Sequence, residues 1–181
     1  MFSLEWLGWL SDTVQTIGDL VPRRVLVEPS DVMVKFKGMK TVVVCRNGIH
    51  WFWPFISKIR IVPAVKQTLY LGNQMVTTND GKAVKIESSI LFEVEDFVVA
   101  TTKFNCYITQ IDDDIKNIIC KYFSKLSFTN EVVGKVTEIN DILTEMSKDK
   151  LKEYGILVHR VQITSVASGF SILHIDNKTN V

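Results

Sequence analysis

Hydrophobic positions change their spacing along this chain, and the changes divide it into segments. In residues 2–21, apolar side chains recur at helical spacing and share one broad face, with polar side chains opposite. Pro22 ends this predicted helix, because proline lacks an N–H donor and disfavours helical geometry at the preceding residue. The apolar face includes two tryptophans and consists of Phe2, Trp6, Trp9, Leu10, Val14, Ile17, Leu20 and Val21.

Residues 25–94 carry short β-branched runs and alternating patterns, which predict strands. Two turn sequences interrupt them, Asn47-Gly48 and Asn79-Asp80-Gly81, and the second predicts a hairpin. In its second arm, apolar and polar side chains alternate, which predicts one mostly apolar and one mostly polar face. The predicted strands are Val25–Val27, Val32–Phe36, Thr41–Cys45, Ile59–Val62, Thr68–Leu71, Gln74–Thr78 and Ala83–Val94.

Helical spacing returns after residue 96. It predicts a short helix at Phe97–Phe104, a second through residues 108–126, and a third from about Asn130 to Tyr154. Gly155 is a natural helix stop. The alternation in Ile156–Val166 then predicts a strand that pairs with the earlier sheet. The pattern therefore predicts an α+β fold: a bent, mainly antiparallel sheet with flanking helices, preceded by the N-terminal amphipathic helix.

Large aromatic side chains are concentrated in Gly48–Leu69, next to lysine and arginine. Trp51, Trp53 and Phe55 precede a basic strand that carries Lys58 and Arg60, and no Asp or Glu occurs from Val32 to Asn79. Amphipathic rings beside cations suit the headgroup level of a membrane. Because Trp51 and Trp53 share one side of an extended segment, both are predicted to face lipid.

The N-terminal helix has two open interpretations: it packs on the domain as a core helix, or it lies in a membrane interface. Burial of about eight apolar side chains at roughly 1–1.5 kcal/mol each gives about 10 kcal/mol. Ordering about 20 residues costs a similar amount. Membrane attachment through this helix therefore requires a second contact or many linked copies.

Composition and charge narrow the function classes. The net charge of +1 argues against a molecule that binds polyanions as a whole. The three cysteines lack CxxC spacing, which favours a reducing compartment without a disulfide framework. No charge-free apolar run reaches the roughly 18 residues of a membrane span, and the N-terminus lacks the basic region of a signal peptide.

Motifs for catalysis are weak, so we predict a protein that is not an enzyme and has no catalytic, cofactor-binding or metal-binding residues. The consecutive acids Asp112–Asp114 point in different directions on a helix, which disfavours a metal site. Neither Gly81-Lys82 nor Gly134-Lys135 has the spacing of a phosphate loop. Binding of single-stranded nucleic acid by stacking stays open as a minor alternative.

The order of several short segments resembles the stomatin–prohibitin–flotillin family, also called SPFH or band 7. The resemblance covers roughly Val25 to Val166, and no single piece of it is specific. The segments that carry it are Val27–Val32, Gly48–Ile56, Thr77–Gly81 and Gly155–Ile163. Family members usually continue into a long coiled coil, whereas this sequence lacks sustained heptads. The resemblance is therefore to a compact member, for which a small or flat oligomer, or co-assembly with a longer partner, is expected.

The resemblance implies a membrane scaffold that forms homo-oligomers and organises lipids and proteins. The alternative is an adaptor or inhibitor of a membrane protein such as a membrane protease. We expect a peripheral membrane protein facing the cytoplasm, with no nucleic-acid partner. The expected domains are an amphipathic membrane helix at 1–24, the SPFH domain at 25–175 and a polar tail at 176–181. The predicted membrane contacts are Phe2, Trp6, Trp9, Leu10, Ile17, Trp51, Trp53, Phe55, Lys58 and Arg60.

Overall fold

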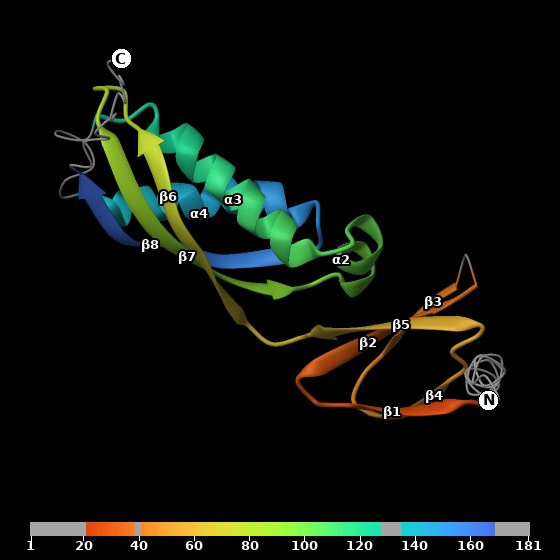
Figure 1. The fold of residues 1–181 in the computed structure, drawn as a ribbon. Coiled ribbons are helices and arrows are strands. Elements are labelled where there is room, and N and C mark those ends of the chain that lie inside the picture. The colour runs from red at the N-terminus through yellow and green to blue at the C-terminus, as the bar shows by residue number, and fades with distance from the viewer. Residues whose placement is uncertain (1–20, 39–40, 128–134, 169–181) are drawn as a thin grey trace, which may run out of the picture. The chain divides into compact units, whose positions relative to one another are not determined.

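A computed structural model of the chain describes residues 21–38, 41–127 and 135–168. These residues divide into two compact units, which are described separately below (Figure 1). Unit 1 comprises the residues up to Val65 together with Val94–Asn105, and unit 2 comprises Lys66–Glu93 and the residues from Cys106 onward. The predicted N-terminal helix, the polar tail and the first residues of the predicted third helix lie outside the described residues.

The described residues of unit 1 form five strands and one short helix, arranged as two small antiparallel sheets with the helix against one of them. In one sheet β1 pairs with β4, and in the other β2 lies between β3 and β5. Helix α2 contacts β2 and β3. The elements are β1 (Arg23–Val27), β2 (Asp31–Lys37), β3 (Thr41–Cys45), β4 (Gly48–Phe52), β5 (Ser57–Pro63) and α2 (Phe97–Lys103).

The core of unit 1 centres on β2, where Val32, Met33 and Val34 are consecutive and all buried. Because successive side chains of a strand point to opposite faces, β2 is covered on both sides. One cover is α2, which begins where the side chain of Asp96 accepts a hydrogen bond from the backbone N–H of Val99 at 2.9 Å. Each residue of β3 or β5 lies on the same face of the sheet as the β2 residue with which it pairs, either toward α2 or away from it.

Unit 2 packs two helices on one face of a three-stranded sheet with strand order β6-β7-β8 (Figure 1). The predicted hairpin is confirmed, since β6 pairs antiparallel with β7. Along β7, every second residue from Val84 to Val94 is buried, as the alternation predicts. The elements are β6 (Gln67–Thr77), β7 (Ala83–Val94), α3 (Tyr107–Phe123), α4 (Val136–Lys152) and β8 (Ile156–Ser168).

Helical spacing explains how α3 covers this sheet. Ile111, Ile115, Ile119 and Phe123 recur every four residues and are fully buried. Helix α4 ends at Lys152, and Gly155 follows with a positive φ of 70°, as expected for a helix stop.

The α+β class and the mainly antiparallel pairing are confirmed, and hydrogen bonding divides the strands into three sheets. Three strands differ from the prediction, and one of them, β4, was not predicted at all. Residues 68–71 and 74–78 were expected as separate strands, but β6 runs through both, with a bulge between Tyr70 and Asn73. Gly72, at a φ of 64°, makes this shift of register possible. In β8, Ile156 and Val158 are buried. The alternation then shifts by one residue, so that Val161 and Ile163 are the next buried positions.

Within the described ranges, every helix is too short or too polar to cross a bilayer.

A hydrogen bond joins α3 to the turn that follows α4 in unit 2. The hydroxyl of buried Tyr154 donates to Asp114 Oδ2 at 2.8 Å, and Gln110 Nε2 donates to the same oxygen at 3.1 Å. Burial, followed by the bond to Asp114, raises the pKa of Tyr154.

We expect the Tyr154→Phe variant to lose about 1–2 kcal/mol of unfolding free energy at pH 7, because Asp114 loses a charge-assisted hydrogen bond. A phenol with a raised pKa stabilises the folded state while it is protonated. Its contribution is therefore complete below about pH 10 and falls as the pH rises through the folded pKa. Urea denaturation at pH 7 and above pH 10 measures both effects. Tyr70→Phe, at a side chain that is 77% exposed, is the control, and an equal loss in both variants would contradict the prediction.

Candidate functional site

Exposed apolar side chains gather in unit 1. Among the described residues of unit 2, large exposed apolar side chains are fewer and are spread over β6, β8 and both helices. In unit 1 they come from β1, β3, β4, β5, the turn between β4 and β5, and the residues just before β1 and just after β5. They are Val21, Leu26, Val43, Val44, Ile49, Trp51, Trp53, Phe55, Ile56, Ile61 and Val65.

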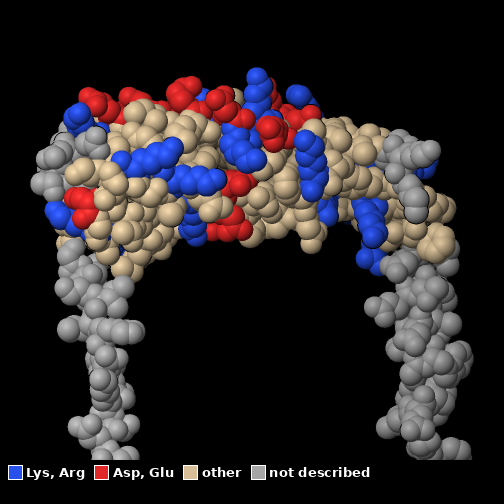
Figure 2. Space-filling view, turned by 90° about the horizontal axis from the view of Figure 1, so that it is seen from above, with Lys and Arg blue, Asp and Glu red and all other residues tan. Residues whose placement is uncertain are grey.

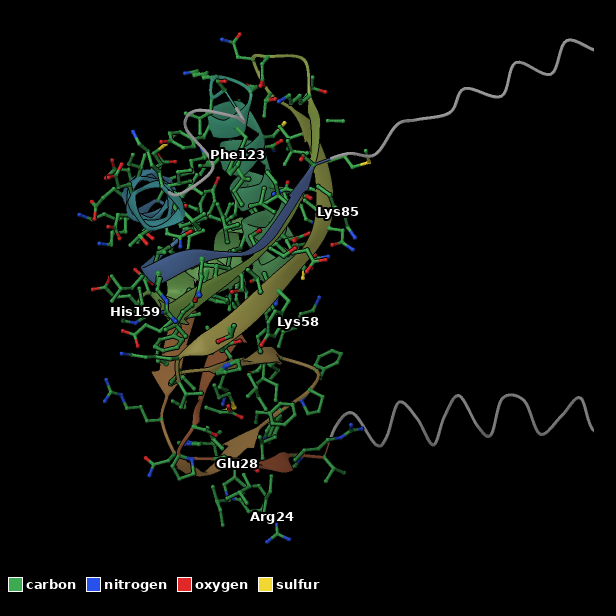
Figure 3. The ribbon with its side chains drawn as sticks, turned by 90° about the vertical axis from the view of Figure 1, so that its left-hand side faces the viewer. Arg24, Glu28, Lys58, Lys85, Phe123 and His159 are labelled. Carbon is green, nitrogen blue, oxygen red and sulfur yellow. The ribbon has the colours of Figure 1, made fainter. Side chains whose placement is uncertain are left out.

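The pairing of β1 with β4 builds an apolar face. Leu26 lies opposite Ile49, and Arg24 lies opposite Trp51. These four side chains share one face of the ladder, because residues two apart on a strand point the same way, and all four are exposed. The guanidinium carbon of Arg24, which is labelled in Figure 3, lies 5.7 Å from the centroid of the Trp51 ring. This ladder therefore presents two aliphatic side chains and an indole with a cation on it.

A tight turn continues the apolar surface. Trp53, Pro54, Phe55 and Ile56 form a turn in which the Trp53 carbonyl accepts from the backbone N–H of Ile56 at 3.1 Å and of Ser57 at 2.8 Å. Proline favours the second position of such a turn. Phe55 follows it at the tip and is 78% exposed. The turn thus holds the Phe55 ring in solvent, although phenylalanine is usually buried in a protein core.

A cavity of about 220 Å³ with both polar and apolar lining lies beside this turn. It is lined by Lys35, Lys37, Trp53, Ile56 and Ser57. The Lys35 Nζ also donates to the carbonyl oxygen of Trp51 at 3.0 Å, which joins β2 to β4. Neither lysine was expected at the site, because only the strand register brings them next to Trp53.

Lys58 and Arg60 lie on the other face of the β3-β2-β5 sheet. They pair with Phe36 and Val34, whereas Lys35 and Lys37 pair with Ile59 and Ser57. Alternation puts these two sets on opposite faces. Lys58 is exposed on β5 (Figure 3).

The Arg60 guanidinium binds the end of α2. It donates from Nη1 to the carbonyl oxygens of Thr101 at 2.8 Å and Phe104 at 3.1 Å, and from Nη2 to Asn105 Oδ1 at 3.2 Å. A contact of this side chain with lipid phosphate stays a prediction.

The predicted residues Trp51, Trp53 and Phe55 are all exposed in unit 1, at the end of β4 and in the turn that follows it. The predicted contacts in the N-terminal helix, which are Phe2, Trp6, Trp9, Leu10 and Ile17, lie outside the described residues. Sequence reasoning missed Leu26 and Ile49, whose exposure follows from the unpredicted strand β4. We call the set Arg24, Leu26, Ile49, Trp51, Trp53 and Phe55 the apolar surface of unit 1.

Groups with the chemistry of an active site are sparse in the described ranges, where no three His, Cys, Asp or Glu side chains cluster closely enough to hold a metal ion. Cys106, exposed at the start of α3, has a pKa lowered by hydrogen bonds, chiefly from the Thr109 hydroxyl at 3.3 Å. Burial raises the pKa of Tyr107. Within the described residues, the partners of these groups are the neutral side chains of Thr109 and Gln67 rather than a base, so the apolar surface is the better candidate.

The family model described as "SPFH domain / Band 7 family" matches residues 25–180. No curated protein matches the chain.

Proposed function

This chain belongs to the SPFH domain / Band 7 family, and we propose that it is a scaffold that attaches to a bilayer through the apolar surface of unit 1 and oligomerises there. Proteins of this family are generally membrane-associated scaffolds without enzymatic activity. The finer proposal concerns the part of this chain that touches lipid.

The observation that carries the proposal is the composition of the apolar surface. Two tryptophans, a phenylalanine and two aliphatic side chains are exposed together, with Arg24 on the Trp51 ring. Tryptophan is enriched at the level of lipid headgroups, because the ring is apolar and its N–H remains wet. Isolated exposed apolar residues are ordinary on soluble proteins, but a contiguous group marks an interaction surface.

The energetics favour attachment through several contacts. Partial burial of five side chains at about 1 kcal/mol each supplies about 5 kcal/mol, which is similar to the cost of immobilising a protein on a surface. One copy would therefore bind weakly through this surface alone. The predicted helix at 2–21 would add a second contact, and oligomerisation would link many such contacts into stable attachment.

The proposal includes a peripheral location that faces a reducing compartment. Cys45, Cys106 and Cys120 are all free thiols, which suits the cytoplasmic side of a membrane.

A second candidate function uses the same surface. An exposed patch rich in tryptophan also suits a protein interface, so an adaptor or inhibitor of a membrane protein such as a protease would present it to that partner. Nucleic-acid binding has less support, because the net charge is only +1 and the surface in Figure 2 carries Asp and Glu as well as Lys and Arg.

Flotation with phosphatidylcholine vesicles tests the proposal. We expect the double variant Trp53→Ser, Phe55→Ser to bind about thirtyfold more weakly than the wild type, because two exposed aromatic rings lose about 1 kcal/mol each. The control is Tyr70→Ser, Met75→Ser, which removes similarly exposed apolar side chains from unit 2.

Equal flotation of the wild type and the first variant would exclude lipid contact through this surface. If the wild type does not bind vesicles of pure lipid but binds one membrane protein in a pull-down, the result would instead favour the adaptor function.

A further inference from the structure

We propose that the cavity between β2, β5 and the β4–β5 turn binds the phosphate of an anionic phospholipid headgroup. The inference rests on the proposed function, because it needs the neighbouring turn to contact the bilayer. Its own evidence is the set of side chains that line the cavity: Lys35, Lys37, Ser57, Trp53 and Ile56.

The strand register builds a binding site for an anion here. Lys35 and Lys37 are two residues apart on β2, so both ammonium groups lie on one face of the sheet. Ser57 is the direct cross-strand partner of Lys37, which adds a hydroxyl donor on the same face. Two cations and a hydroxyl that converge on one cavity suit the oxygens of a phosphate.

Charge in the cavity is uncompensated among the described residues. No carboxylate lines it, and within those residues neither lysine forms an ion pair with Asp or Glu. Lys35 uses one of its three N–H donors on the Trp51 carbonyl, which leaves two for a ligand. An anion would relieve the repulsion between the two ammonium groups, whereas a cation would increase it.

The cavity has the size and wall for a headgroup. Its volume of about 220 Å³ corresponds to roughly seven water molecules at about 30 Å³ each. Ser57, which lines the cavity, is only 6% exposed, so this part of the wall is shielded from solvent. The Gly38 N–H donates to the Ile56 carbonyl at 3.2 Å, which ties the turn to the end of β2 and holds Trp53 beside the lysines.

The position of the cavity points to lipid as the source of the phosphate. Phe55 extends from the same turn and is far more exposed than Trp53. When the Phe55 ring enters the acyl region, Trp53 and the two lysines come to headgroup level, where tryptophan and lysine are favoured. A headgroup with net negative charge fits better than phosphatidylcholine, whose own ammonium would meet the lysines.

The test compares vesicles of phosphatidylcholine alone with vesicles that also contain phosphatidylglycerol, at constant salt. We expect wild type to bind the mixed vesicles about tenfold more tightly. The double variant Lys35→Gln, Lys37→Gln should lose this preference but still bind phosphatidylcholine. The matched control, Lys66→Gln, Lys125→Gln, removes the same charge from exposed positions of unit 2 and should keep the preference. Lys35→Arg, Lys37→Arg keeps both charges and should also keep it, which separates loss of charge from misfolding.

Each outcome decides one claim. If the Lys35→Gln, Lys37→Gln variant prefers phosphatidylglycerol as strongly as wild type, the cavity is not the site. If wild type binds both vesicles equally, the headgroup inference fails while the proposed function stands. If wild type binds neither, the proposed function fails. In a second arm, glycerol 3-phosphate competes with the mixed vesicles; full displacement at micromolar concentration would assign the cavity to a free phosphate ester and overturn the lipid source.

Discussion

We expect the Phe123→Ala variant to lose about 4 kcal/mol of unfolding free energy, the largest effect of any single substitution considered for this protein. Phe123 ends α3 and has no exposed surface. Its ring makes an edge-to-face contact with Tyr122, with the centroids 6.3 Å apart. Removing the ring costs its transfer from water and leaves a cavity in the core of unit 2, because close-packed neighbours relax only partly.

Circular dichroism during urea denaturation measures this loss, because α3 and α4 supply most of the helical signal of the described residues. Ile108→Ala is the control, since Ile108 lies on the same helix but is 39% exposed, and it should cost less than about 1 kcal/mol. Tryptophan emission gives a separate reading, because all four tryptophans precede residue 54 and none belongs to unit 2. A loss below about 1 kcal/mol in Phe123→Ala would contradict the packing described above.

Local patterns predicted the elements in which buried side chains recur at a regular spacing. Strand β7 alternates between buried and half-buried positions as the sequence does, because its central position in the sheet buries one whole face. Helix α3 likewise has an apolar stripe that matches its buried residues. In both elements the periodicity alone carries the information, and no distant residue is needed to interpret it.

Strand β4 was missed because its identity depends on a partner. Ile49 and Trp51 point outward, so the segment lacks the buried face that marks an ordinary strand. Its pairing with β1 joins residues more than 20 positions apart, and that register is invisible to a local pattern. The composition nevertheless identified Trp51, Trp53 and Phe55 as a candidate contact, since so many large rings exceed what one short segment buries.

The cations of the site were harder to predict than the aromatic rings. Parity along β5 shows that Lys58 and Arg60 share a face, but only the packing of α2 shows which face that is. Lys35 and Lys37 likewise lie two residues apart. The predicted strand Val32–Phe36 and the lysine that follows it therefore already indicated that these two side chains share a face. Their link to Trp53 required the fold of the turn.

The second large effect concerns Arg60, for which sequence and structure suggest different roles. We expect Arg60→Met to lose about 3 kcal/mol of unfolding free energy, because three hydrogen bonds from a charged group are removed at once. Two of the acceptors are carbonyl oxygens at the C-terminal end of α2, where the helix has no further N–H to pair with them. Lys58→Met, two residues away on the same exposed face, should cost less than about 0.5 kcal/mol.

Arg60→Lys separates the structural role from a role at the membrane. Lysine keeps the charge but lacks the planar fork that reaches Thr101, Phe104 and Asn105 together. If the main role of Arg60 is to hold the end of α2, this variant loses about 1–2 kcal/mol in urea denaturation yet floats with anionic vesicles as wild type does. If Arg60 acts mainly on lipid phosphate, stability stays near that of wild type, and flotation weakens only when the charge is removed in Arg60→Met. The hydrogen bonds to α2 favour the first result, because three of the five N–H donors of Arg60 are already used at the end of α2.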